Sequence, residues 1–165
     1  MNLPDINTTC QSLSEQLKQY LEHNPHIKNP MVIGVRTGGV WVAQHLIDSL
    51  SLPGPLYSVD ISFYRDDFNR KGLNPKVCGS ELPDSLEDRH IILIDDVIMS
   101  GRTIRAAINE LFDYGRPTSI TLVCLLDVGH RELPLQPDVC GTRLELEPGQ
   151  LIKLNGPTPL TLNLV

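Results

Sequence analysis

The chain has 165 residues, of which 41% are hydrophobic and 21% charged, a composition typical of one globular domain and unlike that of disordered or fibrous proteins. Its 14 Lys and Arg residues against 20 Asp and Glu residues give a formal charge of −6, which argues against nucleic-acid binding through overall charge. Because no apolar run reaches the roughly 20 residues of a membrane helix and the start lacks the features of a signal peptide, we expect a cytoplasmic protein that does not contact membranes.

The first part of the chain predicts a helix, a strand, a second helix and a second strand. An amphipathic helix is predicted over residues 12–21, beginning at SLSE, which has the spacing of a capping box. The apolar sequence MVIGV at 31–35 predicts a buried strand, and the turn RTGG leads from it into a helix that ends before Pro53. Residues 57–63 alternate between apolar and polar side chains, which is typical of a half-buried strand.

The second part begins with a long polar segment. Residues 64–85 contain two Gly and two Pro without a sustained period, which predicts an exposed loop with at most a short hairpin. The apolar run HIILIDD at 90–96 indicates a central strand of a parallel sheet, a helix is predicted from Ile104 to Phe112, and a strand over 119–127. An irregular tail with short strands is expected over 128–165.

Strands that alternate with helices predict an α/β fold with a doubly wound, mostly parallel sheet flanked by helices. In such sheets ligands bind beyond the carboxyl ends of the strands. We therefore look for chemistry where the predicted strands end.

The segment IILIDDVIMSGRT combines a buried strand, two acids, a turn and a helix start. The unpaired amides and the positive end of the helix dipole, with the hydroxyls of Ser100 and Thr103, can bind a phosphate, and Gly101 allows close approach. Asp95 and Asp96 would repel that phosphate at contact, so they are expected a few ångströms away, accepting hydrogen bonds from vicinal hydroxyls or facing Mg²⁺. A ribose 5-phosphate satisfies both demands. The alternative is a pair of solvated acids beside an ordinary helix N-cap.

These same residues, 91–103, resemble the phosphoribosyl pyrophosphate signature of the type I phosphoribosyltransferases. Three further stretches, at 32–43, 60–68 and 115–141, are similar to the PyrR family of pyrimidine-operon attenuators, which are also uracil phosphoribosyltransferases. The resemblance covers about residues 8–145, and its motifs GRPTSI and GHRELP are more specific than the signature.

The resemblance implies the type I phosphoribosyltransferase fold in a single domain spanning 1–165, with a mobile loop at about 64–85 and a C-terminal hood at about 128–165. It also implies that phosphoribosyl pyrophosphate and uracil react with Mg²⁺ to give UMP and pyrophosphate. Asp95 and Asp96 would hold the ribose hydroxyls and the metal.

The remaining site residues fall into three groups by what they would bind. The nucleotide and its 5-phosphate would be contacted by Val97, Met99, Ser100, Gly101, Arg102 and Thr103. The pyrophosphate loop would be Arg36, Thr37 and Gly38, which in that family often contains a cis peptide. Uracil would be bordered by Asp127, Val128 and Gly129, followed by His130 and Arg131, although His130 could equally touch no ligand. The alternative for the pyrophosphate loop is a Gly-rich connection with a surface arginine.

Arg65 belongs to the long loop, which resembles a lid that closes over the substrate. Closure would exclude water from a C1 centre with oxocarbenium character, and Arg65 would meet the charge of the departing pyrophosphate. The alternative is a disordered loop of mixed charge.

Two features depart from the family. Met99 stands where related purine enzymes carry an acid and the attenuators commonly carry Tyr, so we expect apolar packing and no general base from this position. The chain after Gly141 has little similarity to the family's usual tail, so the resemblance does not extend to this part of the hood. We nevertheless predict retained activity.

RNA binding is a second function that the resemblance implies, through a UMP-dependent complex with pyrimidine leader mRNA across a dimer surface. The charges do not suggest it, because residues 60–116 hold eight Lys and Arg against eleven Asp and Glu. The alternatives are an RNA-binding regulator with vestigial activity and a phosphoribosyltransferase for another base, while the absence of GxGxxG disfavours a dinucleotide-binding domain. We also expect a homodimer or a higher homo-oligomer.

Overall fold

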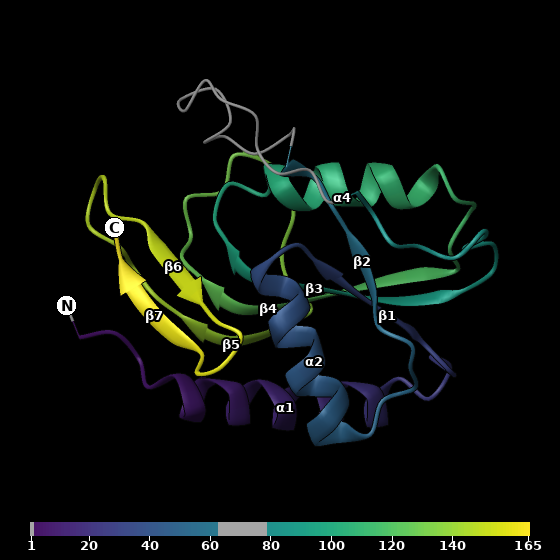
Figure 1. Ribbon diagram of the computed structural model, residues 1–165, viewed down its shortest axis with the longest axis horizontal. Helices are drawn as coiled ribbons and strands as arrows, with labels where there is room; N and C mark the ends of the chain where they lie inside the picture. The colour runs from purple at the N-terminus through teal and green to yellow at the C-terminus, as the bar shows by residue number, and fades with distance from the viewer. Residues whose placement is uncertain (1, 63–78) are drawn as a thin grey trace.

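The computed structural model describes residues 2–62 and 79–165, which form a layered α/β fold (Figure 1). Within the described residues the main sheet has five strands in the order β2-β1-β3-β4-β5, and every neighbouring pair is parallel. The strands are β1 (Met31–Val35), β2 (Tyr57–Val59), β3 (His90–Ile98), β4 (Ser119–Asp127) and β5 (Val139–Arg143). The doubly wound parallel sheet predicted from the sequence is confirmed.

Helices cover both faces of this sheet. In Figure 1, α1 (Ile6–His23) and α2 (Gly38–Leu50) lie on one side and α4 (Arg102–Phe112) lies on the other. One core packs Leu13, Leu17 and Leu46 of the first two helices against Ile92 and Val123 of the sheet. The opposite core packs α4 against the alternate residues of the same strands. Strands buried on both faces explain why their sequences are continuous apolar runs.

The first helix begins earlier than the sequence predicted. It starts at Ile6, and the N-cap is Asp5, whose Oδ1 accepts a hydrogen bond from the amide of Thr8 at 2.8 Å. The predicted capping box at Ser12 is therefore wrong, because Ser12 lies inside the helix and donates instead to the carbonyl of Gly141 at 3.4 Å.

Two further predictions need correction. The half-buried strand expected over 57–63 is limited to Tyr57–Val59, and its polar residue Ser58 is buried, so the alternation did not mark an exposed face. The tail contains short strands as expected, but the first of them, β5, joins the main sheet, with Cys140 opposite Cys124 of β4. The rest of the tail forms an antiparallel hairpin of β6 (Ile152–Asn155) and β7 (Thr161–Leu164).

The long loop expected over 64–85 is described only in part. Residues 79–85 are irregular and include a bridge between Glu81 and Ser58, while residues 64–78 lie outside the described residues. Across the described part of the chain, no helix combines the length and the apolar character that crossing a bilayer requires.

Candidate functional site

The site lies where the chain order across the sheet reverses. From β1 the chain continues to β2 on one side, whereas β3 pairs with β1 on the other side, with Gly34 opposite Ile94. At such a switch point the loops after the two strands diverge and leave a crevice at the carboxyl edge of the sheet. The register therefore brings the loop that begins at Arg36 beside Asp95 and Asp96.

The loop after β1 packs directly against the acid pair. The peptide between Arg36 and Thr37 is cis, as the resemblance implied for this loop. Gly38 begins α2, and a Cβ at this position would collide with the carboxylate of Asp96. A larger residue here would have to displace the Asp96 side chain or the loop, so glycine in RTGG allows the loop to approach the acids closely.

Arg36 is held by neighbours on the other side of the loop. Its Nη2 donates to Oε1 of Glu81 at 2.9 Å, and its Nε donates to Oγ of Ser58 at 3.1 Å. The Glu81 side chain is 75% exposed, and ion pairs with such exposed partners contribute little to stability. The pair thus holds the guanidinium at the edge of the crevice without tying it into the core. Sequence reasoning missed Glu81, which lies 45 residues from Arg36 and has no local signal.

The two acids lie within β3, as the predicted run over 90–96 implied. Asp95 is buried at 2% exposure, and its Oδ1 accepts from the amide of Asp96 at 3.0 Å, while Asp96 is partly exposed. Because β3 continues to Ile98, the strand is two residues longer than the predicted run. Burial of Asp95 does not fit the alternative of two solvated acids.

The turn after β3 leaves backbone donors open at the start of α4. The N-cap residue Gly101 has no side chain to cap the helix, and among the described residues the amides of Gly101 and Thr103 donate to no protein acceptor. Gly101 has a φ of +91°, a conformation that favours glycine. Open amides at a helix N-terminus are suited to an anion.

Ser100 and Arg102 are engaged by the protein itself. The Oγ of the buried Ser100 accepts from the amide of Arg102 at 3.2 Å, and the Arg102 side chain pairs with Glu132 at 2.6 Å. The amide of Arg102 is thus used within the turn. The open donors of this segment are the amides of Gly101 and Thr103, on either side of Arg102.

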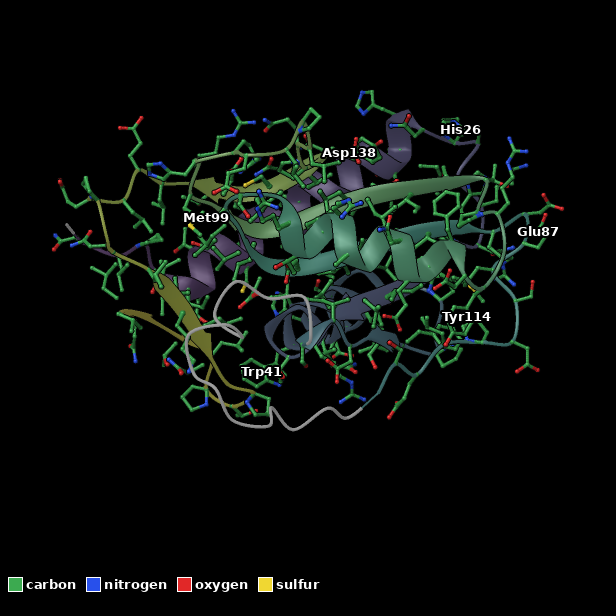
Figure 2. All side chains as sticks on the ribbon, turned by 90° about the horizontal axis from the view of Figure 1, so that it is seen from above. His26, Trp41, Glu87, Met99, Tyr114 and Asp138 are labelled. Atoms are coloured by element: carbon green, nitrogen blue, oxygen red, sulfur yellow. The ribbon has the colours of Figure 1, made fainter. Side chains whose placement is uncertain are left out.

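Met99 lies at the carboxyl end of β3. Figure 2 places it on the opposite side of the molecule from Glu87 and Tyr114. Its side chain is partly buried, as is that of Val97, and its carbonyl accepts from Arg131 at 2.8 Å. A thioether here offers apolar contact and no titratable proton.

Asp127, at the end of β4, is already bound by its surroundings. Its Oδ2 accepts from Nη2 of Arg131 at 2.8 Å, and its Oδ1 accepts from the amide of Gly129 at 3.0 Å. Burial raises the pKa of this carboxyl, but the hydrogen bonds from Arg131 and Gly129 outweigh burial, so the pKa is below its ordinary value. The carboxylate is ionised and both of its oxygens accept hydrogen bonds from within the protein.

The two residues after Asp127 continue the turn. Val128 is buried, and its amide donates to the carbonyl of Ile98 at 3.1 Å. Gly129 has a φ of +71° and open space around it, and the following His130 is exposed. Arg65 lies outside the described residues.

The guanidinium of Arg131, a residue predicted to border uracil, is bonded to Asp127 and to the backbone of two loops. The spacing of four residues between Asp127 and Arg131 is the one signal that points to their pairing. Spacing alone is informative on a helix, but these residues follow a strand.

Comparison with known proteins gives one family match and several close relatives. The phosphoribosyl transferase domain family matches residues 2–147. The bifunctional protein PyrR of Pseudomonas syringae pv. tomato is 54% identical over 99% of this chain and 96% of its own length. The bifunctional protein PyrR of Pseudomonas fluorescens is 54% identical over 99% of this chain and 97% of its own length.

Solved structures match in fold at lower identity. A hypoxanthine-guanine phosphoribosyltransferase from Bacillus anthracis superposes with a TM-score of 0.69 at 19% identity, covering 92% of this chain and 86% of that chain. The hypoxanthine phosphoribosyltransferase of Trypanosoma cruzi gives 0.66 at 16% identity, covering 89% and 81%. At these identities the likeness concerns the fold alone.

Proposed function

This chain belongs to the phosphoribosyltransferase family and, within it, to the bifunctional PyrR proteins, and from that premise we propose that it transfers ribose 5-phosphate from phosphoribosyl pyrophosphate to uracil. The products are UMP and pyrophosphate. The observation that carries the proposal is the meeting, at one switch point, of the acid pair, the open amides before α4 and the glycine loop after β1.

The sugar-phosphate half of the substrate binds along β3 and the start of α4. The 5-phosphate accepts from the amides of Gly101 and Thr103 and from the Thr103 hydroxyl, helped by the helix dipole. Asp96, whose carboxylate accepts no hydrogen bond from the described residues, accepts from the ribose hydroxyls, and Asp95 supports it from the interior. This division keeps the carboxylates away from the phosphate.

Pyrophosphate binds at the loop formed by Arg36, Thr37 and Gly38. The Arg36 guanidinium, now paired with the exposed Glu81, can pair equally well with phosphate oxygens. Arg65 is proposed to approach the leaving group from the segment outside the described residues. Positive charge at these two residues stabilises the charge that develops on pyrophosphate as the C1 bond breaks.

Mg²⁺ is the proposed cofactor, and Asp95 and Asp96 are the residues that would hold it. No group of three or more His, Cys, Asp or Glu side chains within the described residues forms a metal cluster. A site of two carboxylates fits Mg²⁺, which commonly binds proteins through one or two carboxylates and takes its other ligands from substrate phosphates and water. When bound, the ion would neutralise charge on the pyrophosphate.

Uracil binds beside the turn after β4, at Val128 and Gly129. The amides of Val128 and Gly129 donate to Ile98 and Asp127, and the carbonyl of Gly129 accepts from Arg131 at 3.4 Å. The carbonyl of Val128 and the amides that follow Gly129 therefore remain to read the edge of the base. Asp127 shapes this turn from behind, and Met99 packs against the nucleotide. Neither supplies a general base, so the reaction relies on leaving-group stabilisation.

Steady-state formation of UMP from uracil and phosphoribosyl pyrophosphate tests the proposal. The control is the double variant Asp95→Ala/Asp96→Ala, which removes the acid pair. Turnover well above this control is expected for the natural chain, with hypoxanthine and orotate as poorer substrates. Equal rates for the natural chain and the control would refute the proposal.

RNA binding is the second candidate function, supported by the word bifunctional in the names of the relatives. Occupancy of the site by UMP would raise the affinity for a pyrimidine leader RNA, because linked sites change each other's affinity reciprocally. A gel shift of that RNA with and without UMP distinguishes a UMP-dependent regulator, which binds the RNA more tightly with UMP, from an enzyme alone. An enzyme without this function would show the same shift in both lanes.

We further propose that residues 1–165 form one domain and that the chain assembles as a homodimer or a larger homo-oligomer. The family match to 2–147 supports a single domain, and symmetric dimers are the commonest assemblies of soluble proteins. Light scattering of the purified chain would return a mass above 18.4 kDa, and a monomer at all concentrations would contradict it.

A further inference from the structure

We propose that Arg131 is a positioning residue that fixes the turn before α4 and thereby sets the affinity for the 5-phosphate group. The inference rests on the proposed function, because it assumes that this turn binds phosphate. Arg131 need not touch any ligand for this effect. It acts through the backbone of Met99 and Ser100.

The guanidinium of Arg131 joins three parts of the chain. Its Nη1 donates to the carbonyl of Met99 at 2.8 Å, its Nε donates to the carbonyl of Leu135 at 2.7 Å, and its Nη2 donates to Oδ2 of Asp127 at 2.8 Å. The side chain is only 14% exposed, and that of Asp127 only 7%. Charge-assisted hydrogen bonds between side chains that are this well buried are strong and geometrically specific.

The residues after Arg131 hold the same turn. The carbonyl of Ser100 accepts from the amides of Glu132 at 3.0 Å and Leu133 at 3.1 Å, and Glu132 pairs with Arg102. The loop after β4 is therefore bonded to two successive carbonyls of the turn, at Met99 and at Ser100.

Peptide geometry links these carbonyls to the donors that face the ligand. In a trans peptide the carbonyl and the following amide point in opposite directions within one plane. Holding the Met99 carbonyl toward Arg131 turns the amide of Ser100 away from it. Holding the Ser100 carbonyl toward Glu132 and Leu133 likewise turns the amide of Gly101 away from the loop after β4. The Arg131 contact thus orients the amide of Ser100, and the neighbouring contacts of Glu132 and Leu133 orient the amide of Gly101, toward the opposite side of the turn, where we place the phosphate.

This geometry makes a prediction that differs from that of a base-contacting arginine. A residue that positions the turn affects ribose 5-phosphate and UMP equally, because both carry the 5-phosphate. A residue that contacts uracil affects UMP and leaves ribose 5-phosphate unchanged. Comparing the two ligands therefore tests the inference directly.

The experiment measures binding of ribose 5-phosphate and of UMP by calorimetry to the natural chain and to Arg131→Ala, with thermal unfolding as a check of folding. Both dissociation constants are expected to rise by the same factor, about tenfold or more, the equivalent of one charge-assisted hydrogen bond. In turnover, KM for phosphoribosyl pyrophosphate is expected to rise more than kcat falls. Guanidinium at concentrations far below those that unfold proteins is expected to restore part of the affinity of Arg131→Ala.

Arg143→Gln is the matched control, because Arg143 lies 3.9 Å from the same Asp127 carboxylate but is 76% exposed and donates no hydrogen bond to the turn. It is expected to bind both ligands like the natural chain. Should Arg131→Ala fail to fold, Asp127→Asn takes its place, since asparagine keeps an oxygen for Gly129 and weakens the hold on Arg131. It is expected to raise both dissociation constants by a smaller common factor.

Unchanged binding of both ligands by a folded Arg131→Ala would overturn the inference, and so would weaker binding of UMP alone. An equally large effect of Arg143→Gln would also overturn it, because charge near Asp127 and not orientation of the turn would then be responsible. If the natural chain itself binds neither ligand, the proposed function fails first, and the inference falls with it.

Discussion

Asp96 and Asp127 lie at the same edge of one sheet, on neighbouring strands, and the protein treats them in opposite ways. Asp96 is partly exposed, and its carboxylate accepts no hydrogen bond from the described residues. Asp127 is 5% exposed and has both oxygens occupied, by Arg131 and Gly129. The difference teaches that two acids at the end of neighbouring strands can serve different ends, one with its carboxylate left open and one with its carboxylate used to hold a loop.

Asp96→Asn is the strongest test of this contrast. We expect UMP formation to fall by about a hundredfold or more, the usual scale for loss of one electrostatic contact to the reacting group, while the thermal unfolding midpoint stays close to that of the natural chain. Asp113→Asn, at the exposed C-cap of α4, is the control and should leave both unchanged. A large loss of stability with little loss of rate would reverse the roles assigned to the two acids.

Gly38→Ala tests the Asp96 carboxylate through its contact with the loop after β1. The added Cβ collides with Asp96, so the acid or the loop after β1 must move. Because misplacement of reacting groups by about an ångström can cost up to a hundredfold in rate, we expect kcat to fall by about tenfold or more. Initial rates measured beside a circular dichroism spectrum of the folded variant check this, and full activity would show that the contact is not needed.

Asp127→Asn should change stability more than chemistry. Removing one partner of a largely buried ion pair leaves Arg131 poorly compensated, and we expect a loss of about 2 kcal/mol in the free energy of unfolding. Denaturant titration measures it. A variant as stable as the natural chain would mean that the Arg131 contact adds nothing to the fold.

The same pair predicts a pH dependence. The pKa of Asp127 is lower in the folded chain than in the unfolded chain, where it is about 3.9. The stability that ionised Asp127 contributes is therefore complete above the pKa of the unfolded chain, and it is lost as the pH falls through the lower pKa of the folded chain. The stability difference between the natural chain and Asp127→Asn should be constant near neutral pH and shrink below about pH 4.

The smallest expected effect is on thermal stability and comes from Asp5, whose carboxylate caps a helix. A backbone hydrogen bond and a side-chain hydrogen bond from Thr8 lower the pKa of Asp5, which caps α1. Asp5→Ala should lower the unfolding midpoint by a few degrees, whereas Ser12→Ala, inside the helix, should have less effect. Scanning calorimetry compares them, and the reverse order would restore the capping box that the structure contradicts.

The elements predicted well are those whose signal is local. Strands β3 and β4 are long apolar runs buried on both faces, and the predicted start and end of β4 agree with the structure. Helix α4 follows from the spacing of Ile104, Ala107 and Leu111, which are all buried. The turn between β3 and α4 was predicted for the same reason, because acids, glycine and hydroxyls are adjacent in the sequence.

The features that were not predicted depend on contacts with residues that are distant in the sequence. Strand β5 reads VCGTR, with little apolar character, and it forms because β4 offers it an edge. The pairing of Arg131 with Asp127 at the end of β4 was also not predicted from the sequence. Likewise Glu81 reaches Arg36 across 45 residues, beyond the range of any periodicity.

Strand β3 is the middle strand of the five described in the main sheet, with β1 bonded on one side and β4 on the other. Fraying that begins at the outer strands β2 or β5 must cross another strand before it reaches Asp95. The amides around the acid pair should therefore be among the last to exchange with heavy water, and this part of the sheet should persist in partly opened forms that have already lost either edge.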